Sequence, residues 1–263
     1  MKPPPSARLI TGHPLAKGLV GCWSLSENSG IVANDFSLND NALSFVGDTA
    51  WVYGKFGSAL DFPNSADYIT RAVAAGDSLY WGTQLSLAFW IKFNTIAVWD
   101  TIFASGANHQ TSIWLAVSAI NNMRLELNDT DHNFDPGLSL GEWFHIFVTL
   151  TGTRAQVYIN TVNKLDAAWA VAPTNTNLFR VGTDGTVSYD LDAQIDNIMA
   201  WNRGFTVPEI VDHYEKTFGM FARRGWPVGF DTGAVPPAAE SVFGSLLTEA
   251  MFIKYKKGMY SEI

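Results

Sequence analysis

The sequence has little of what several large classes of protein require. Its one cysteine, Cys22, lies in an apolar stretch, so neither a disulfide framework nor a cysteine-based metal site is expected. No run approaches the ~18 apolar residues of a membrane span. Residues 1–17 lack the apolar segment of a signal peptide. There are 17 basic against 25 acidic residues, and the net charge of −8 disfavours nucleic acid as a partner. We therefore expect a protein that is made in the cytoplasm and has no membrane or nucleic-acid partner.

Patterns that carry catalysis are also missing. The five histidines show no metal-binding spacing, and no serine lies in a G-x-S-x-G context. Residues 126–131 come nearest to a paired-carboxylate pattern, but Glu126 alternates with Arg124 and Asn128 as on the solvated face of a strand. His145 lies inside an apolar strand and is interpreted as structural. We expect a protein that is not an enzyme.

Aromatic and apolar residues are plentiful. The 263 residues are 47% hydrophobic and 13% aromatic, with 10 Trp, which suits strand interiors and carbohydrate platforms alike. Short apolar runs separated by Gly, Pro, Asn and Asp recur roughly every ten residues. Residues 85–93 form the clearest run, with large apolar side chains at every odd position. This pattern predicts an all-β fold, an antiparallel sandwich or jelly roll, with one short helix late in the chain.

Residues 191–214 predict a strand, a turn and that helix. Apolar residues alternate with polar ones until Asp196 and Asn197, where the alternation breaks and indicates a bulge or a change of face. Thr206 and Glu209 have the spacing of a capping box at the start of a helix.

The composition divides the chain into three parts. Residues 1–17 are a Pro-rich arm, expected to be disordered on its own or to lie across a neighbouring subunit. Residues 18–215 hold the strand pattern. Residues 216–263 form a linker and docking tail, in which residues 240–263 suit either a helix or, by slight preference, an extended or hairpin structure. The tail is too small for a core of its own and must dock on something.

Several motifs occur in a consistent order along the chain: G-L-V-G-C-W-S-L at 18–25, D-F-S-L-N-D-N at 35–41, K-F-G-S-A-L-D-F at 55–62, Q-I-D-N-I at 194–198 and N-R with a later E-I at 202–210. Together with three further strand motifs between residues 87 and 160, they resemble the laminin-G-like domains of the concanavalin A-like lectin/glucanase superfamily. The resemblance covers residues 18–215. It implies a concanavalin A-like jelly-roll sandwich of two antiparallel sheets.

Many members of this family bind one calcium ion near the first loop and the late I-D-E strand. The resemblance implies Ca²⁺ as a cofactor here, with Asp35, Asn39, Asn41 and Asp196 as its ligands. Asn197 stands where the family usually has Glu, which removes a charge from the hard oxygen cage that calcium prefers. Alternatively, these side chains cap turns and bond to the backbone.

Loops of such sandwiches commonly carry ligand sites. Trp81, Trp99, Trp169 and Tyr53 fall at loops or strand ends, where an exposed aromatic ring stacks on a sugar. His109 lies in a polar segment, and residues 129–137 form a polar loop; both are candidates for a recognition edge. The alternative for the aromatic residues is that they plug the ends of the sandwich.

Residues 214–224 resemble a tail found after laminin-G-like domains encoded by tailed bacteriophages. That resemblance implies a non-catalytic virion structural protein, such as a capsid decoration or head or tail accessory protein. Its location would be the virion, and its partners would be capsid or tail proteins and copies of itself in a homo-oligomer. The alternative function is a glycan-binding adhesin that recognises a bacterial cell-surface or environmental polysaccharide.

Overall fold

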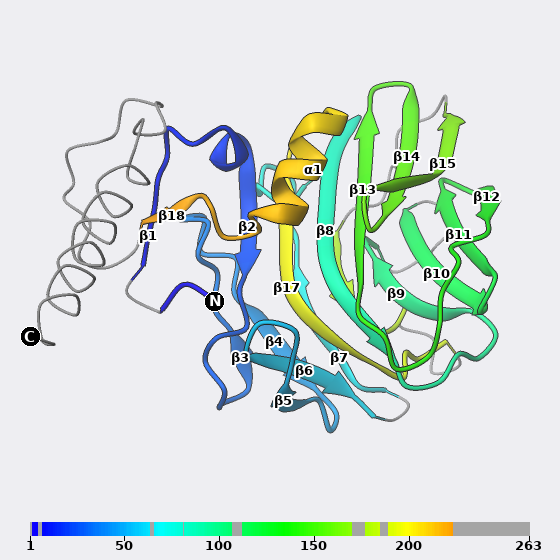
Figure 1. Cartoon of the computed structure of the whole chain (residues 1–263), viewed down its shortest axis with the longest axis horizontal. Helices are drawn as coiled ribbons and strands as arrows, with labels where there is room; N and C mark the ends of the chain where they lie inside the picture. Colours follow the sequence, from blue (N-terminus) through cyan, green and yellow to red (C-terminus); the bar gives the residue numbers. More distant parts are fainter. Residues whose placement is uncertain are drawn as a thin grey trace, which may run out of the picture. The chain divides into compact units, whose positions relative to one another are not determined.

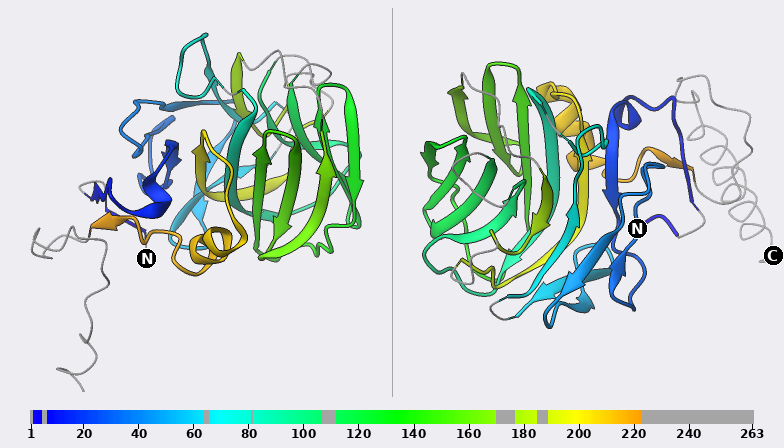
Figure 2. Two further views of the ribbon diagram at one scale, coloured as in Figure 1. Left: turned by 90° about the horizontal axis from the view of Figure 1, so that it is seen from above. Right: turned by 180° about the vertical axis from the view of Figure 1, so that it is seen from behind.

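The computed structural model describes residues 2–4, 7–63, 66–80, 82–106, 112–169, 177–184 and 189–222. Within them, two eight-stranded antiparallel sheets pack face to face, as the sequence predicts (Figure 1). We call them the helix-side sheet and the opposite sheet; the views in Figure 2 show both layers from two further directions. Among the described residues, no helix has the length and apolar character needed to cross a membrane.

The helix-side sheet is centred on two long strands, β8 (Gln84–Phe93) and β17 (Ala193–Trp201), which pair with each other. Strands β13, β14 and β15 follow outward from β8, whereas β6 and β5 follow outward from β17, with β2 also paired to β17. The bounds of these strands are β2 (Leu19–Trp23), β5 (Ala50–Tyr53), β6 (Ser58–Phe62), β13 (Phe144–Thr151), β14 (Arg154–Ile159) and β15 (Val162–Ala168).

The opposite sheet runs in the order β12-β11-β10-β9-β16-β7-β4-β3. Its strands are β3 (Val32–Ala33), β4 (Leu43–Val46), β7 (Tyr68–Ala72), β9 (Asp100–Ala104), β10 (Ile113–Ala119), β11 (Asn122–Leu127), β12 (Thr130–Phe134) and β16 (Leu178–Val181). The expected polar loop at 129–137 is therefore partly wrong, because β12 occupies its first half. Asn128 and Asp129, at φ 49° and 63°, form the two-residue turn that starts β12.

The main core lies between the two sheets. The odd-numbered apolar side chains of β8, predicted to line the core, are buried in it together with residues of β10, β13 and β17. A second apolar cluster lies on the outer face of the helix-side sheet. There Phe147, Met199 and Trp201 pack against Ile210 of α1 (Val207–Glu215) and against Leu15.

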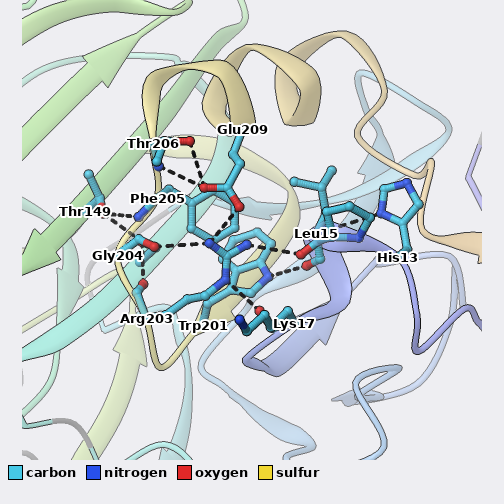
Figure 3. A network of polar contacts seen from close by, with 12 residues as sticks. His13, Leu15, Lys17, Thr149, Trp201, Arg203, Gly204, Phe205, Thr206 and Glu209 are labelled. Atoms are coloured by element: carbon cyan, nitrogen blue, oxygen red, sulfur yellow. Dashed lines mark hydrogen bonds and ion pairs between the residues drawn. The ribbon is translucent and has the colours of Figure 1, made fainter. Parts of the chain in front are cut away.

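The predicted strand, turn and helix at 191–214 are confirmed. The β8–β17 register shifts between Asp196 and Met199, and Asn197 has φ 54°, so β17 has the expected bulge. At the start of α1, the backbone N–H and the hydroxyl of Thr206 both donate to Glu209 Oε2 at 2.9 Å (Figure 3). The carboxylate thereby satisfies a free N–H group at the helix N-terminus.

The Pro-rich arm packs on its own chain, contrary to both expectations for it. Leu15, in the short 3₁₀ helix η1 (Pro14–Ala16), is 1% exposed, and its carbonyl accepts a 2.7 Å hydrogen bond from Trp201 Nε1 (Figure 3). Strand β1 (Arg8–Leu9) pairs with β18 (Phe221–Ala222). The compact unit thus runs from Met1 to Arg224 and includes the arm and the base of the expected tail. The predictions for residues 225–263 lie outside the described residues.

Candidate functional site

Aromatic side chains gather on the outer face of the opposite sheet. Trp114 of β10 points away from the main core, because its neighbours Ile113 and Leu115 point into it and side chains alternate along a strand. The ring centroid of Trp114 lies 6.0 Å from that of Trp99 and 6.2 Å from that of Tyr189. Two chain segments far apart in sequence therefore place rings beside one strand.

Arg124 of β11 joins this aromatic group to two carboxylates. Its Cζ lies 3.8 Å from the centroid of the Trp99 ring, within cation–π range. Its Nη1 lies 3.0 Å from Asp131 Oδ1 and 3.3 Å from Glu126 Oε2, and those two acids face each other across β11 and β12. The expectation of a solvated strand face is wrong for Glu126, which is only 2% exposed and pairs with Arg124.

Trp99 has an unusual backbone. Its φ is 70°, in the left-handed region that bulky residues rarely adopt. Such strain costs roughly 1–3 kcal/mol and is concentrated at functional sites. Trp114 helps to hold the segment in place, since its Nε1 donates to Thr101 Oγ1 at 2.9 Å and Thr101 N donates to Tyr189 O at 3.1 Å. Trp99, a predicted ligand residue, is thus a partly exposed ring on a fixed support.

Two carboxylates lie next to these aromatic residues in the sequence. Asp100 follows Trp99 directly, and Asp190 follows Tyr189. Burial raises the pKa of Asp100; the Ala97 N–H bond opposes that rise, and the nearby charges of Asp192 and Asp190 add to it. Asp131 lies beside the aromatic group through its ion pair with Arg124, and Arg180 of β16 stands opposite Ala104, which in turn stands opposite Trp114. The site therefore combines ring surface with hydrogen-bond acceptors.

The other predicted ligand residues do not join Trp99. Trp169 is 6% exposed and belongs to the main core, as in the alternative that it plugs the sandwich. Trp81 and His109 lie outside the described residues. Sequence reasoning missed Trp114, Tyr189 and Arg124. The alternation of Trp114 with Ile113 and Leu115 was a usable signal, because it places an indole on the outer face.

The polar side chains of the loop at 35–41 form hydrogen bonds to other groups of the protein. Asp35 Oδ1 accepts from the backbone N–H groups of Cys22 and Ser37, both at 2.8 Å. Its Oδ2 accepts from Ser37 Oγ at 2.7 Å and from Asn41 N at 3.0 Å. The amide of Asn41 donates to Val20 O at 2.7 Å, and that of Asn39 donates to Leu19 O at 3.2 Å. These contacts match the alternative in which the loop residues bond to backbone.

Asp196, the fourth predicted calcium ligand, has a different partner. Its Oδ1 lies 2.5 Å from Nζ of Lys2, and its Oδ2 accepts from Phe56 N at 3.0 Å. Among the described residues, no group of three His, Cys, Asp or Glu side chains is placed to share a metal ion. The Lys2 ammonium pairs with the Asp196 carboxylate, and the polar groups of the 35–41 loop bond to other groups of the protein. This arrangement does not fit the oxygen cage that calcium requires. Calcium binding stays a prediction.

Two packed antiparallel sheets with this strand order form a lectin-like β-sandwich. A family model described as the concanavalin A-like lectin/glucanases superfamily (Laminin_G_3) matches residues 64–211, and the chain belongs to this family. A search of curated proteins found no match to the sequence.

Solved structures share the fold at low sequence identity. Domain 4 of AbnA, an extracellular arabinanase from Geobacillus stearothermophilus in complex with arabinotriose, is 18% identical with a TM-score of 0.60, and the match covers 74% of this chain and 97% of that one. The receptor binding domain of botulinum neurotoxin C/D mosaic serotype is 18% identical with a TM-score of 0.61, covering 76% of this chain and 51% of that one. Trypanosoma rangeli sialidase in complex with the inhibitor DANA is 16% identical with a TM-score of 0.58, covering 74% and 32%. The present chain thus spans about half of the toxin domain and a third of the sialidase.

Proposed function

We propose that the protein is a non-catalytic carbohydrate-binding module whose site is the face around Trp99, and that its ligand is an uncharged glycan. The observation that carries the proposal is Trp99 itself, a partly exposed indole held at a strained φ of 70° beside two further rings. Indole surfaces bind the apolar faces of sugar rings. Domain 4 of AbnA, similar in fold, is in complex with arabinotriose.

Charge supports an uncharged ligand. Arg124 is already paired with Glu126 and Asp131, so its charge is compensated within the protein. Asp131, whose side chain is 44% exposed, repels the anionic groups of uronic or sulfated sugars and accepts hydrogen bonds from hydroxyl groups.

The same pairing argues against catalysis. Glycoside hydrolysis needs one carboxyl group to donate a proton and a second to act as base or nucleophile. Arg124 forms ion pairs with both Glu126 and Asp131, so both carboxylates are already engaged by the same guanidinium. We propose that these acids position Arg124 under the Trp99 ring.

Affinity electrophoresis tests the proposal. The native protein is run through gels that contain neutral polysaccharides (arabinan, mannan, β-glucan, galactan) or acidic ones (polygalacturonate, alginate). We expect retardation by at least one neutral polymer that is unchanged by added NaCl, because an uncharged ligand is not screened. Trp99→Ala should weaken binding roughly tenfold or more, as loss of a central aromatic anchor does.

Tyr53→Ala is the matched control, since Tyr53 is 87% exposed and lies on β5 of the other sheet. It should bind like the wild type. Retardation only by acidic polymers would contradict the uncharged ligand. No retardation by any polymer, or equal binding by the Trp99 variant, would contradict the site.

The virion role is the second candidate. It is favoured by the pairing of β1 with β18, in which Leu9 stands opposite Phe221. This pairing brings the arm and the base of the tail together at one place, from which both segments would attach the sandwich to a particle. Display of a glycan-binding sandwich on a capsid or tail is compatible with the first proposal.

A further inference from the structure

Lys2 and Asp196 meet inside the molecule although the chain separates them by nearly its whole described length. Nζ of Lys2 lies 2.5 Å from Asp196 Oδ1 and 2.9 Å from Leu25 O, and it also donates to Ser58 O. The two charged side chains are 6% and 0% exposed. An ammonium group has three N–H donors and no acceptor. Three oxygens therefore take all three of its protons.

The backbone at Gly54 lies very close to the Asp196 carboxylate. A Cβ at Gly54 would lie 2.8 Å from Asp196 Oδ2 and 2.3 Å from the Cβ of Ala59, so only glycine fits there. Leu25, which supplies one of the three oxygens, has φ 54°, a left-handed conformation that is strained for leucine. Gly54 and Leu25 are thus both constrained, one beside the Asp196 carboxylate and the other beside the ammonium.

The oxygen set distinguishes an ammonium from a divalent metal. Calcium takes about six to eight oxygen ligands, whereas an ammonium needs three acceptors. Three oxygens surround Nζ, and Asp196 Oδ2 is committed to Phe56 N. Burial lowers the pKa of Lys2 and raises that of Asp196, and in each case the partner's charge opposes the shift. Each charge is therefore tolerated only while the other is present.

We infer that Lys2 is a covalently attached cation that supplies the countercharge of Asp196, one of the four residues that the family resemblance assigns to calcium, and that it fastens residues 2–4 to the sandwich. The chain carries the countercharge for Asp196 within its own sequence. The folded state then needs no divalent ion, and its stability depends on residue 2.

Thermal unfolding of Lys2→Met tests the inference, with Lys17→Met as the matched control. Lys17 belongs to the same arm, but it is exposed and its side chain makes no ion pair among those found in the described part of the chain. We expect Lys2→Met to lower Tm by roughly 10 °C, because it leaves a buried carboxylate without its partner, and Lys17→Met to change it little. The wild-type Tm should be the same in EDTA and in CaCl₂. Equal Tm values for the two variants, or a lower wild-type Tm in EDTA, would overturn the inference.

Two further measurements apply if Lys2→Met does not fold. The double variant Lys2→Met/Asp196→Asn removes both charges and should recover most of the lost Tm, since no uncompensated ion remains. In the unaltered protein, reductive methylation followed by peptide mass spectrometry should modify Lys17 at least tenfold faster than the side chain of Lys2. Equal rates for the two lysines would show an accessible Lys2 and refute the buried ammonium.

Discussion

His145 Nε2 lies 3.2 Å from His213 Nδ1, joining β13 to α1 in the interior of the molecule. Both histidines are fully buried. His213 Nε2 lies 3.4 Å from Met199 Sδ, and because sulfur is only an acceptor, that nitrogen carries the proton. His213 Nδ1 then accepts from His145 Nε2–H, and both rings are neutral. Burial accounts for this: it lowers the pKa of His213 to about 3 and that of His145 well below its ordinary value, and the repulsion that would arise if both rings were protonated lowers the pKa of His145 further.

The histidine pair predicts loss of stability in mild acid. The folded-state pKa values lie below the unfolded value of ~6.5, so the unfolded chain binds protons between pH 6.5 and the folded values and the native state does not. Above pH 7 the pair does not lower the free energy of unfolding, and below pH 7 it lowers this free energy further as the pH falls. Between pH 7 and pH 5 the pair should cost about 4 kcal/mol of unfolding free energy. Urea unfolding across this range measures it.

Two variants distinguish the contribution of the histidine pair to this pH dependence from that of the carboxylates. His213→Gln retains an amide that bonds to His145, so it should remove about half of the pH slope. His132→Gln, on β12 and away from the pair, leaves both buried histidines in place and is the control. An identical slope in all three proteins would mean that other groups cause the acid sensitivity.

The interpretation of His145 as structural illustrates how far sequence reasoning reaches. An imidazole in the run of β13 is expected to be buried, and it is. Its partner on α1 was not predictable, because hydrogen bonds between distant segments leave no local pattern. The bulge in β17 and the cap of α1 were predictable, since each depends on residues within a few positions of one another.

The calcium set and the aromatic face show the limit of local patterns. Asp35 and Asp196 match motifs, yet the chain engages them with Ser37 and Lys2, and no rule of spacing places residue 2 beside residue 196. Trp99 was found as an aromatic residue at a strand end. Its strained φ and its contact with Arg124 arise from β9, β10 and β11 packing together, which only the structure shows.

The strained backbone at Trp99 predicts that two substitutions which both abolish binding will differ in their effect on stability. Trp99→Gly and Trp99→Ala both remove the ring and its contact with Arg124, but glycine adopts φ 70° without the penalty that alanine retains. We expect the Gly variant to be more stable than the Ala variant by about 1 kcal/mol in urea unfolding, and both to lose glycan binding. If the Ala variant is equally stable, the backbone is not strained there.

Arg203 connects the N-terminal arm to helix α1. Its guanidinium donates to Lys17 O at 2.7 Å and to Pro14 O at 3.2 Å, and its Nη1 lies 2.8 Å from Glu209 Oε1 (Figure 3). Lysine cannot reproduce this fork of donors. Arg203→Lys should lower stability by about 2 kcal/mol and speed amide exchange in residues 13–17, as measured by hydrogen exchange.

Arg154 provides the control for Arg203, because its ion pair with Asp166 is exposed on both sides. Arg154→Lys should change stability by less than about 0.5 kcal/mol and leave exchange in the arm unaltered. Faster exchange in the arm of both variants would indicate a general loosening instead of a loss of these specific bonds.

Removal of residues 225–263 tests whether this segment is needed for folding or only for assembly. The compact unit ends at Arg224, so the shortened protein should keep its Tm and its glycan binding. If the virion role is correct, the native protein purifies as part of a particle, and the shortened one is a soluble monomer that no longer assembles. Light scattering and electron microscopy of both forms measure this. Unfolding of the shortened protein would instead place the tail in the sandwich core, because a segment that only attaches the module contributes nothing to its stability.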